Sequence, residues 1–185
     1  MNQILFINAC VRENSRTLRL ARRALSRFEG SITEVNLQKE AIPPLTAAAL
    51  MRREAGNPQD AAYARDFAQA DAVVVAAPFW DLSFPAALKC YFEAINIAGV
   101  TFTYQDGVPV PLCRLTKFLY VTTSGGPYMP DFGSAYAEAL ARVFYGAKDI
   151  RCVYAENLDI DGADTEAILR KAEQEISEIP VDFFR

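Results

Sequence analysis

Residues 72–77 read Ala-Val-Val-Val-Ala-Ala and are followed by Pro78, and this unbroken apolar run is the strongest constraint on the fold. A β-strand that is apolar at every position has both faces covered, which is typical of the parallel sheets of α/β proteins. Parallel neighbours are joined by crossover connections, usually helices. The run therefore predicts a sheet with helices on both faces.

Strand-like and helix-like segments alternate along the rest of the chain. Further strand-like runs occupy residues 4–8, 31–37, 118–122 and 150–155. Helical spacing or a helix-start signal predicts helices over residues 15–28, 47–53, 58–70, 86–97, 134–144 and 163–178. Residues 99–112 form an extended excursion with a turn at Asp106-Gly107. We expect one open, doubly wound α/β domain over residues 1–185.

Composition and charge exclude several classes of partner. The 185 residues are 51% hydrophobic and 23% charged, as in an ordinary globular protein. The net charge of −4 offers no basic surface for nucleic acid or anionic lipid. No apolar run reaches the roughly 18 residues that cross a bilayer, and Met1 leads into a strand rather than a signal peptide. We expect a cytoplasmic protein with no nucleic-acid or membrane partner.

The chain contains no histidine. Ser–His and Cys–His dyads, histidine-ligated zinc and an imidazole proton shuttle are therefore excluded. The four cysteines form no C-x-x-C pair, so a zinc ribbon or a thioredoxin-type redox pair is not expected, and we expect no metal. If the protein is an enzyme, a bound cofactor should supply its chemistry.

In doubly wound sheets the ligand lies beyond the carboxyl ends of the strands, so the loops after strands one, three and four are the places to search. The first loop has neither G-x-G-x-x-G nor G-K-[ST], but it places Arg12, Ser15, Arg16 and Thr17 at the start of a helix. The free N–H groups and the dipole of a helix N-terminus favour an anion such as phosphate. The alternative is that Asn14 or Ser15 only caps the helix.

The other two loops carry aromatic residues and glycines. Pro78, Phe79, Trp80 and Asp81 follow the third strand and offer a flat apolar wall for a planar ligand, unless they plug the core. The fourth strand leads into residues 122–128, where Gly125-Gly126 would let backbone N–H groups approach a ligand, unless they only form a turn. A phosphate seat, a flat wall and a rim of donors together predict a site for flavin mononucleotide (FMN).

Three segments resemble the FMN-dependent NAD(P)H:quinone oxidoreductases, and among them the NADH-azoreductases. Residues 72–89 are similar to that family's strand, aromatic proline loop and proline-led helix, residues 98–104 resemble its A-G-x-T-F-x-Y segment, and residues 122–126 match its [ST]-[ST]-x-G-G loop. The first loop departs from the family, since Cys10-Val11-Arg12 stands where azoreductases tend to have serines. The resemblance implies a flavodoxin-like, five-stranded parallel sheet of order 2-1-3-4-5.

The resemblance also implies non-covalent FMN, a homodimer with sites at the subunit interface, and NADH or NADPH as co-substrate. Residues from all three loops would bind FMN: Cys10, Arg12, Ser15, Arg16, Thr17, Pro78, Phe79, Trp80, Asp81, Thr123, Ser124, Gly125 and Gly126. No side chain is expected to be catalytic, although Tyr104 or Tyr128 could assist.

The predicted reaction is a ping-pong, two-electron reduction in which the flavin takes electrons from NAD(P)H and passes them to a quinone, an azo compound or a similar flat electrophile. Two alternatives remain open at this point. One is a flavodoxin-type electron carrier to protein partners, and the other is a flavoprotein that senses quinones. Neither the physiological acceptor nor the choice between NADH and NADPH is encoded in an identifiable residue.

Overall fold

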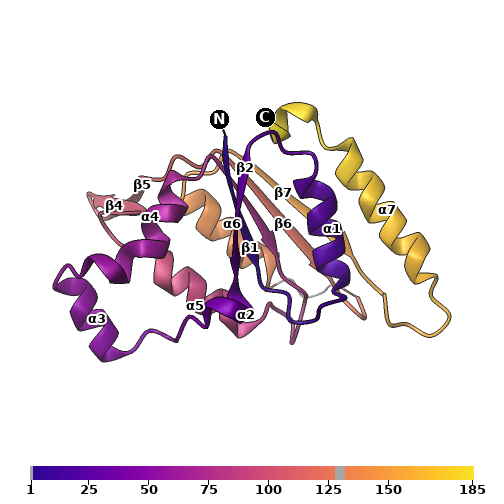
Figure 1. The fold of residues 1–185 in the computed structure, drawn as a ribbon, viewed down its shortest axis with the longest axis horizontal. Coiled ribbons are helices and arrows are strands. Elements are labelled where there is room, and N and C mark those ends of the chain that lie inside the picture. The colour runs from indigo at the N-terminus through magenta and orange to yellow at the C-terminus, as the bar shows by residue number, and fades with distance from the viewer. Residues whose placement is uncertain (1, 128–131) are drawn as a thin grey trace.

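The computed structural model describes residues 2–127 and 132–185, and its centre is a five-stranded parallel sheet (Figure 1). The strands are β1 (Gln3–Asn8), β2 (Ser31–Asn36), β3 (Ala72–Ala76), β6 (Lys117–Thr123) and β7 (Asp149–Ala155). Their order is β2-β1-β3-β6-β7, which is 2-1-3-4-5 when the strands of this sheet are counted along the chain. All five residues of β3 are buried between β1 and β6. The predicted fold class is confirmed.

Helices cover both faces of the sheet, as Figure 1 shows. On one face, α1 (Arg16–Leu25) and α7 (Thr165–Glu178) pack on β1, β3, β6 and β7 through a cluster that includes Leu20 and Ile176. On the other face lie α4 (Ala62–Gln69), α5 (Ala86–Ile95) and α6 (Ser134–Val143). None of the described helices has the length and apolar composition needed to span a bilayer.

Several elements differ from the prediction. The excursion at residues 99–112 is an antiparallel hairpin of β4 (Phe102–Gln105) and β5 (Val108–Pro111), with the predicted turn at Asp106 and Gly107. The chain also forms α2 (Leu37–Glu40) and η2 (Val181–Phe184), which were not expected. The predicted second helix, α3 (Ala47–Glu54), is present, while residues 58–70 begin as η1 (Pro58–Ala61) before α4.

A row of arginines on α1 holds α7 and the C-terminal segment. Arg19 and Arg23 lie one turn apart on one face of α1, and Arg27 follows just after the C-cap Ser26. Arg19 forms ion pairs with Glu166 (2.9 Å) and Glu173 (2.8 Å). Arg23 donates to the Ser177 hydroxyl, and Arg27 donates to two backbone carbonyls at the end of α7. Each exposed pair contributes only about 0–1 kcal/mol, so the row mainly fixes how α7 lies against α1.

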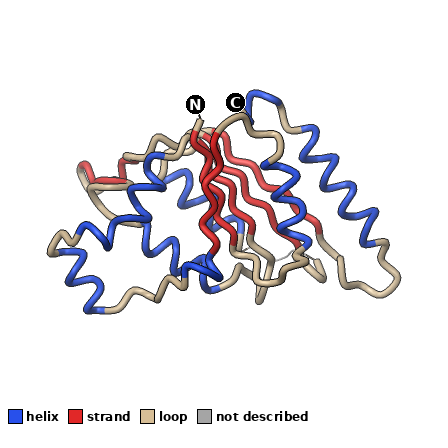
Figure 2. Tube along the Cα trace, in the orientation of Figure 1, coloured by secondary structure: helices blue, strands red, loops and turns tan. Residues whose placement is uncertain are grey.

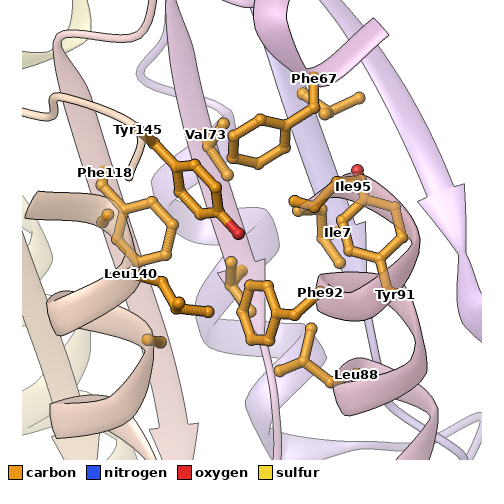
Figure 3. Packing of buried hydrophobic residues seen from close by; sticks show 14 of the residues in the cluster. Ile7, Phe67, Val73, Leu88, Tyr91, Phe92, Ile95, Phe118, Leu140 and Tyr145 are labelled. Atoms are coloured by element: carbon orange, nitrogen blue, oxygen red, sulfur yellow. The ribbon is translucent and has the colours of Figure 1, made fainter. Parts of the chain in front are cut away.

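Two buried tyrosines on the α4–α5–α6 side differ in how their hydroxyls are satisfied. Figure 3 shows Tyr91 and Tyr145 among Phe67, Phe92 and other apolar side chains of this core. The Tyr145 hydroxyl donates to Asn96 Oδ1 at 2.7 Å. Within the described part of the chain, the buried Tyr91 hydroxyl has no hydrogen-bond partner. A buried polar group without a partner costs about 1–3 kcal/mol.

We therefore predict that Tyr91→Phe raises the free energy of unfolding by about 1 kcal/mol, because it removes the unpaired hydroxyl and keeps the ring. Tyr145→Phe is the matched control and should lower it by about 1 kcal/mol, because it removes a made hydrogen bond. Urea unfolding of the two variants and the wild type measures both. Equal losses of stability in the two variants would contradict the prediction.

Candidate active site

A cleft of about 320 Å³ lies at the carboxyl edge of the sheet, where the loops after β1, β3, β6 and β7 meet. These loops are drawn in tan at the lower edge of the sheet in Figure 2. The cleft is lined by Val11, Arg12, Asn14, Ser15, Arg16, Thr17, Pro78, Phe79, Trp80, Thr123, Ser124, Gly125, Leu158 and Asp159. The structure thus brings together all predicted cofactor-binding residues except Cys10, Asp81 and Gly126.

The first loop places helix donors and cations at one end of the cleft. Ser15 is the N-cap of α1, and its Oγ accepts from the Leu18 N–H at 3.2 Å. Ser15 therefore caps α1, and its hydroxyl also forms a hydrogen bond with the Cys10 thiol, which lowers the thiol pKa against the larger effect of burial. Among the described residues, the backbone N–H groups of Arg16 and Thr17 have no hydrogen-bond partner. The Thr17 hydroxyl is buried against that of Thr123, with the two oxygens 2.6 Å apart.

The loop after β3 is a tight turn that presents Trp80. Trp80 and Ser83 exchange two backbone hydrogen bonds of 3.0 and 2.8 Å, and the residues between them, Asp81 and Leu82, have φ of 51° and 65°. Two successive left-handed residues define a type I′ turn, which is costly for leucine. Asp81 is exposed at the turn and does not line the cleft. Its predicted contact with the cofactor is not supported by this placement.

Gly125 serves a purpose that the sequence did not indicate. A Cβ at this position would lie 2.5 Å from Oδ2 of Asp159, so the glycine makes room for a side chain of its own chain. Three backbone hydrogen bonds hold residues 157–159 against residues 124–126. No described atom lies within 4 Å of a Cβ built on Gly126, which does not line the cleft. The N–H groups of both glycines donate no hydrogen bond to a described residue, so they remain available.

Two other predicted residues, Cys10 and Tyr104, do not line the cleft. The Cys10 thiol is buried under the loop near the carbonyl of Ala76, and its backbone N–H donates to Asn8 Oδ1 at 3.0 Å. Burial raises the pKa of this thiol to about 11, so Cys10 is a neutral thiol beneath the loop, and its contact with the cofactor stays a prediction. Tyr104 is exposed on β4 and does not line the cleft. Tyr128 lies outside the described residues.

The prediction missed the loop after β7, which supplies Leu158 and Asp159. Asp159 forms an ion pair with Arg16, with Oδ1 2.7 Å from Nη1, and Arg16 also donates to the Leu158 carbonyl at 3.4 Å. The only signal available in the sequence was topological, because the fifth strand ends at the same edge of a parallel sheet as the others.

The two ends of the cleft differ in chemistry. One end carries Arg12, Arg16 and unpaired helix N–H groups, which suit a phosphate. The other end is the turn of Pro78, Phe79 and Trp80, with the side chain of Trp80 39% exposed. A flat heteroaromatic ring joined to a phosphate matches both ends, so the residues present fit FMN.

Comparison with known proteins decides the family. The family described as flavodoxin-like fold matches residues 2–179. The FMN-dependent NADH:quinone oxidoreductase of Coprothermobacter proteolyticus is 31% identical, over 99% of this chain and 100% of its own. FMN-dependent NADH:quinone oxidoreductase 2 of Clostridium acetobutylicum is 33% identical over the same shares of the two chains. The chain belongs to this flavodoxin-like oxidoreductase family.

Solved structures agree on the fold of this flavodoxin-like oxidoreductase. An FMN-dependent NADH-azoreductase from Bacillus anthracis str. Ames Ancestor, solved in complex with FMN, covers 100% of both chains with a TM-score of 0.84 and 22% identity. An azoreductase from Bacillus anthracis str. Sterne has a TM-score of 0.84 and 24% identity, and it covers 97% of this chain and 98% of its own. The resemblance stated from the sequence is confirmed.

The glycine pair provides a test of how the cleft is built. We predict that Gly125→Ala lowers the free energy of unfolding of the protein without ligand by about 1 kcal/mol, because the added methyl group overpacks against Asp159. Gly126→Ala is the control and should change stability by less than about 0.5 kcal/mol, since its site is open. Urea unfolding compares the two, and an equal effect would show that Asp159 does not rest on Gly125.

Proposed function

We propose that this protein is an FMN-dependent NAD(P)H oxidoreductase that reduces quinones, azo compounds or similar flat electrophiles by two electrons. The observation that carries the proposal is one cleft with a cationic helix end on one side and the Phe79–Trp80 wall on the other, in a chain of this family. When bound, FMN supplies the redox chemistry. The roles below are those of the chain's own residues.

The polar end of the cleft would hold the phosphate. Arg12 and Arg16 supply positive charge, Ser15 supplies a hydroxyl group, and the N–H groups of Arg16 and Thr17 point from the first turn of α1. Hydrogen bonds to a charged group contribute about 1.5–3 kcal/mol each, so this donor set suffices to anchor a phosphate. The Thr17–Thr123 contact would fix the floor of the seat rather than bind the ligand.

The apolar end would orient the flavin ring and the acceptor. Phe79 and Trp80 give a flat wall, and the turn between Trp80 and Ser83 holds the indole in place. The free N–H group of Gly125, which lines the cleft, would stabilise negative charge at the pyrimidine edge of the ring, because fixed donors stabilise a developing anion without reorganising. The chain contains no histidine that could transfer a proton to a specific acceptor. Acceptors would therefore be selected by stacking on the flat wall.

A flavodoxin-type carrier is the less supported alternative. Relatives at 31% and 33% identity are named FMN-dependent NADH:quinone oxidoreductases, which supports an enzyme that acts on small molecules. A net charge of −4 also gives little of the acidic surface that would recruit protein partners electrostatically.

Turnover separates the two functions. Protein reconstituted with FMN should be yellow, should lose its flavin absorbance when NADH is added without oxygen, and should oxidise NADH continuously with menadione or an azo dye. Trp80→Ala should lower kcat/KM by about tenfold because it removes the flat wall, whereas Trp80→Phe keeps a ring and should lose much less. Protein without FMN is the blank. Absence of turnover with every acceptor would contradict the enzymatic proposal.

We further propose that the protein is a single domain that works as a cytoplasmic homodimer. The support is the apolar surface outside the cleft, where Met51 on α3 and Tyr104 and Val108 on the β4–β5 hairpin are each more than half exposed. Contiguous apolar surface marks subunit contacts, and these side chains would supply it if they meet a second copy of the chain. Light scattering should give twice the chain mass of 20.5 kDa, and Val108→Asp should shift the protein toward monomer. A wild-type mass of one chain at micromolar concentration contradicts the dimer.

A further inference from the structure

Asp159 is an acidic side chain in a cleft that we propose binds a phosphate, and a bound phosphate would repel it. Among the described residues that line the cleft it is the only acidic one, and it lies beside Ser15, Arg16 and Gly125. A carboxylate near a phosphate costs electrostatic energy that a neutral residue would avoid. Its position therefore needs a physical explanation beyond filling space.

The backbone around Asp159 is held firmly. The N–H groups of Asn157, Leu158 and Asp159 donate to the carbonyls of Gly126, Ser124 and Gly125 at 2.9–3.2 Å. This pairing fixes the Cα of Asp159 above Gly125, where the missing Cβ gives the carboxylate room. The loop is thus built to deliver this side chain into the cleft.

The side chain itself is held only by Arg16. Oδ1 lies 2.7 Å from Arg16 Nη1, and the side chains of Arg16 and Asp159 are 41% and 65% exposed. An ion pair this exposed is weak and exchanges readily. Rotation of the Asp159 side chain toward solvent would break this ion pair without moving any backbone, while Arg16 Nη1 keeps its 3.4 Å contact with the Leu158 carbonyl.

We propose that Asp159 is an internal stand-in for the phosphate: it neutralises Arg16 while the cleft is empty and gives up this arginine when a phosphate enters. The proposal rests on the proposed function, since the phosphate is that of FMN. Arg16 is then paired with Asp159 in the empty cleft and with the phosphate in the filled cleft. The positive charge at the first turn of α1 is therefore compensated in both states. Asp159 competes with the phosphate, and it lowers the affinity for the phosphate tail without touching the flavin ring.

The effect should depend on the phosphate. Asp159→Asn keeps the shape of the side chain and removes its charge, so it should tighten FMN binding by about fivefold, because a like charge close to the phosphate is removed. Riboflavin carries the same ring without the phosphate, and its affinity should stay within about twofold of the wild type. Asp159→Ala should change FMN affinity in the same direction. Asp161→Asn, an exposed carboxylate of the same loop outside the cleft, is the matched control and should leave FMN affinity within about twofold.

The experiment is a titration of the protein, freed of flavin, with FMN and with riboflavin. Trp80 is the chain's only tryptophan and lines the cleft, so its fluorescence reports occupancy in every variant. Tighter FMN binding in Asp159→Asn with unchanged riboflavin binding supports the exchange. Unchanged FMN binding in Asp159→Asn overturns the proposal. Weaker FMN binding in this variant also overturns it, because Asp159 would then orient Arg16 for the phosphate rather than compete with it. Equal gains for FMN and riboflavin also overturn it. Absence of FMN binding in every variant overturns the proposed function and this proposal together.

Discussion

Residues Ala72–Ala76 of β3 are shut off from water on both faces, and each is paired to β1 on one side and to β6 on the other. A buried strand cannot leave its backbone groups unpaired, so β1 and β6 must run alongside it in parallel register. Parallel strands end at one edge, and the loops after β1, β3, β6 and β7 therefore meet there. The position of the cleft follows from this packing, and backbone hydrogen bonds between residues 157–159 and residues 124–126 add the loop after β7 to its lining.

The arginines at α1 lie in a row that runs from the contact with α7 to the cleft. The face of α1 turned to α7 carries Arg19 and Arg23, and Arg27 follows just after the helix ends. The partners of these three arginines lie on α7 or at its end. Arg16 continues this row by one turn toward the cleft, where its partner is Asp159. The row of arginines that positions α7 thus ends in Arg16, which lines the cleft. The first three arginines have structural partners on a helix, and only the fourth is paired with a residue on a loop in the cleft.

Much of the fold could be predicted because it depends on local sequence. The apolar run of β3, the alternation of strands and helices, and the turn at Asp106-Gly107 are encoded within short windows. The residues of the first three loops in the cleft followed from the topology that these windows imply. The short α2 and the C-terminal η2 carry no comparable periodic signal, and η2 is fixed by the packing of Phe183 and Phe184 on the sheet.

The differences between the predicted site residues and the lining of the cleft have a common cause in tertiary packing. Whether Cys10 faces the core or the cleft depends on where β1 ends, and a shift of one residue reverses the direction of a side chain along a strand. Asp81 turns away because a type I′ turn requires its left-handed conformation. Asp159 enters the cleft because residues 157–159 pair with residues 124–126. No local sequence pattern predicts this contact between two loops.

The two ends of the cleft also differ in how firmly they are built. At the apolar end, the Leu82 backbone has a φ of 65°, which costs about 1 kcal/mol for a residue with a side chain. Two Trp80–Ser83 backbone hydrogen bonds and one from the Ser83 hydroxyl to the Phe132 carbonyl hold the strained turn. At the polar end, the exposed ion pair with Arg16 is the only hydrogen bond or ion pair of the Asp159 side chain within the described residues. A ring would therefore meet a wall whose position is fixed in advance, while the tail meets side chains that can rearrange, so orientation is set by the aromatic end and affinity is tuned at the charged end.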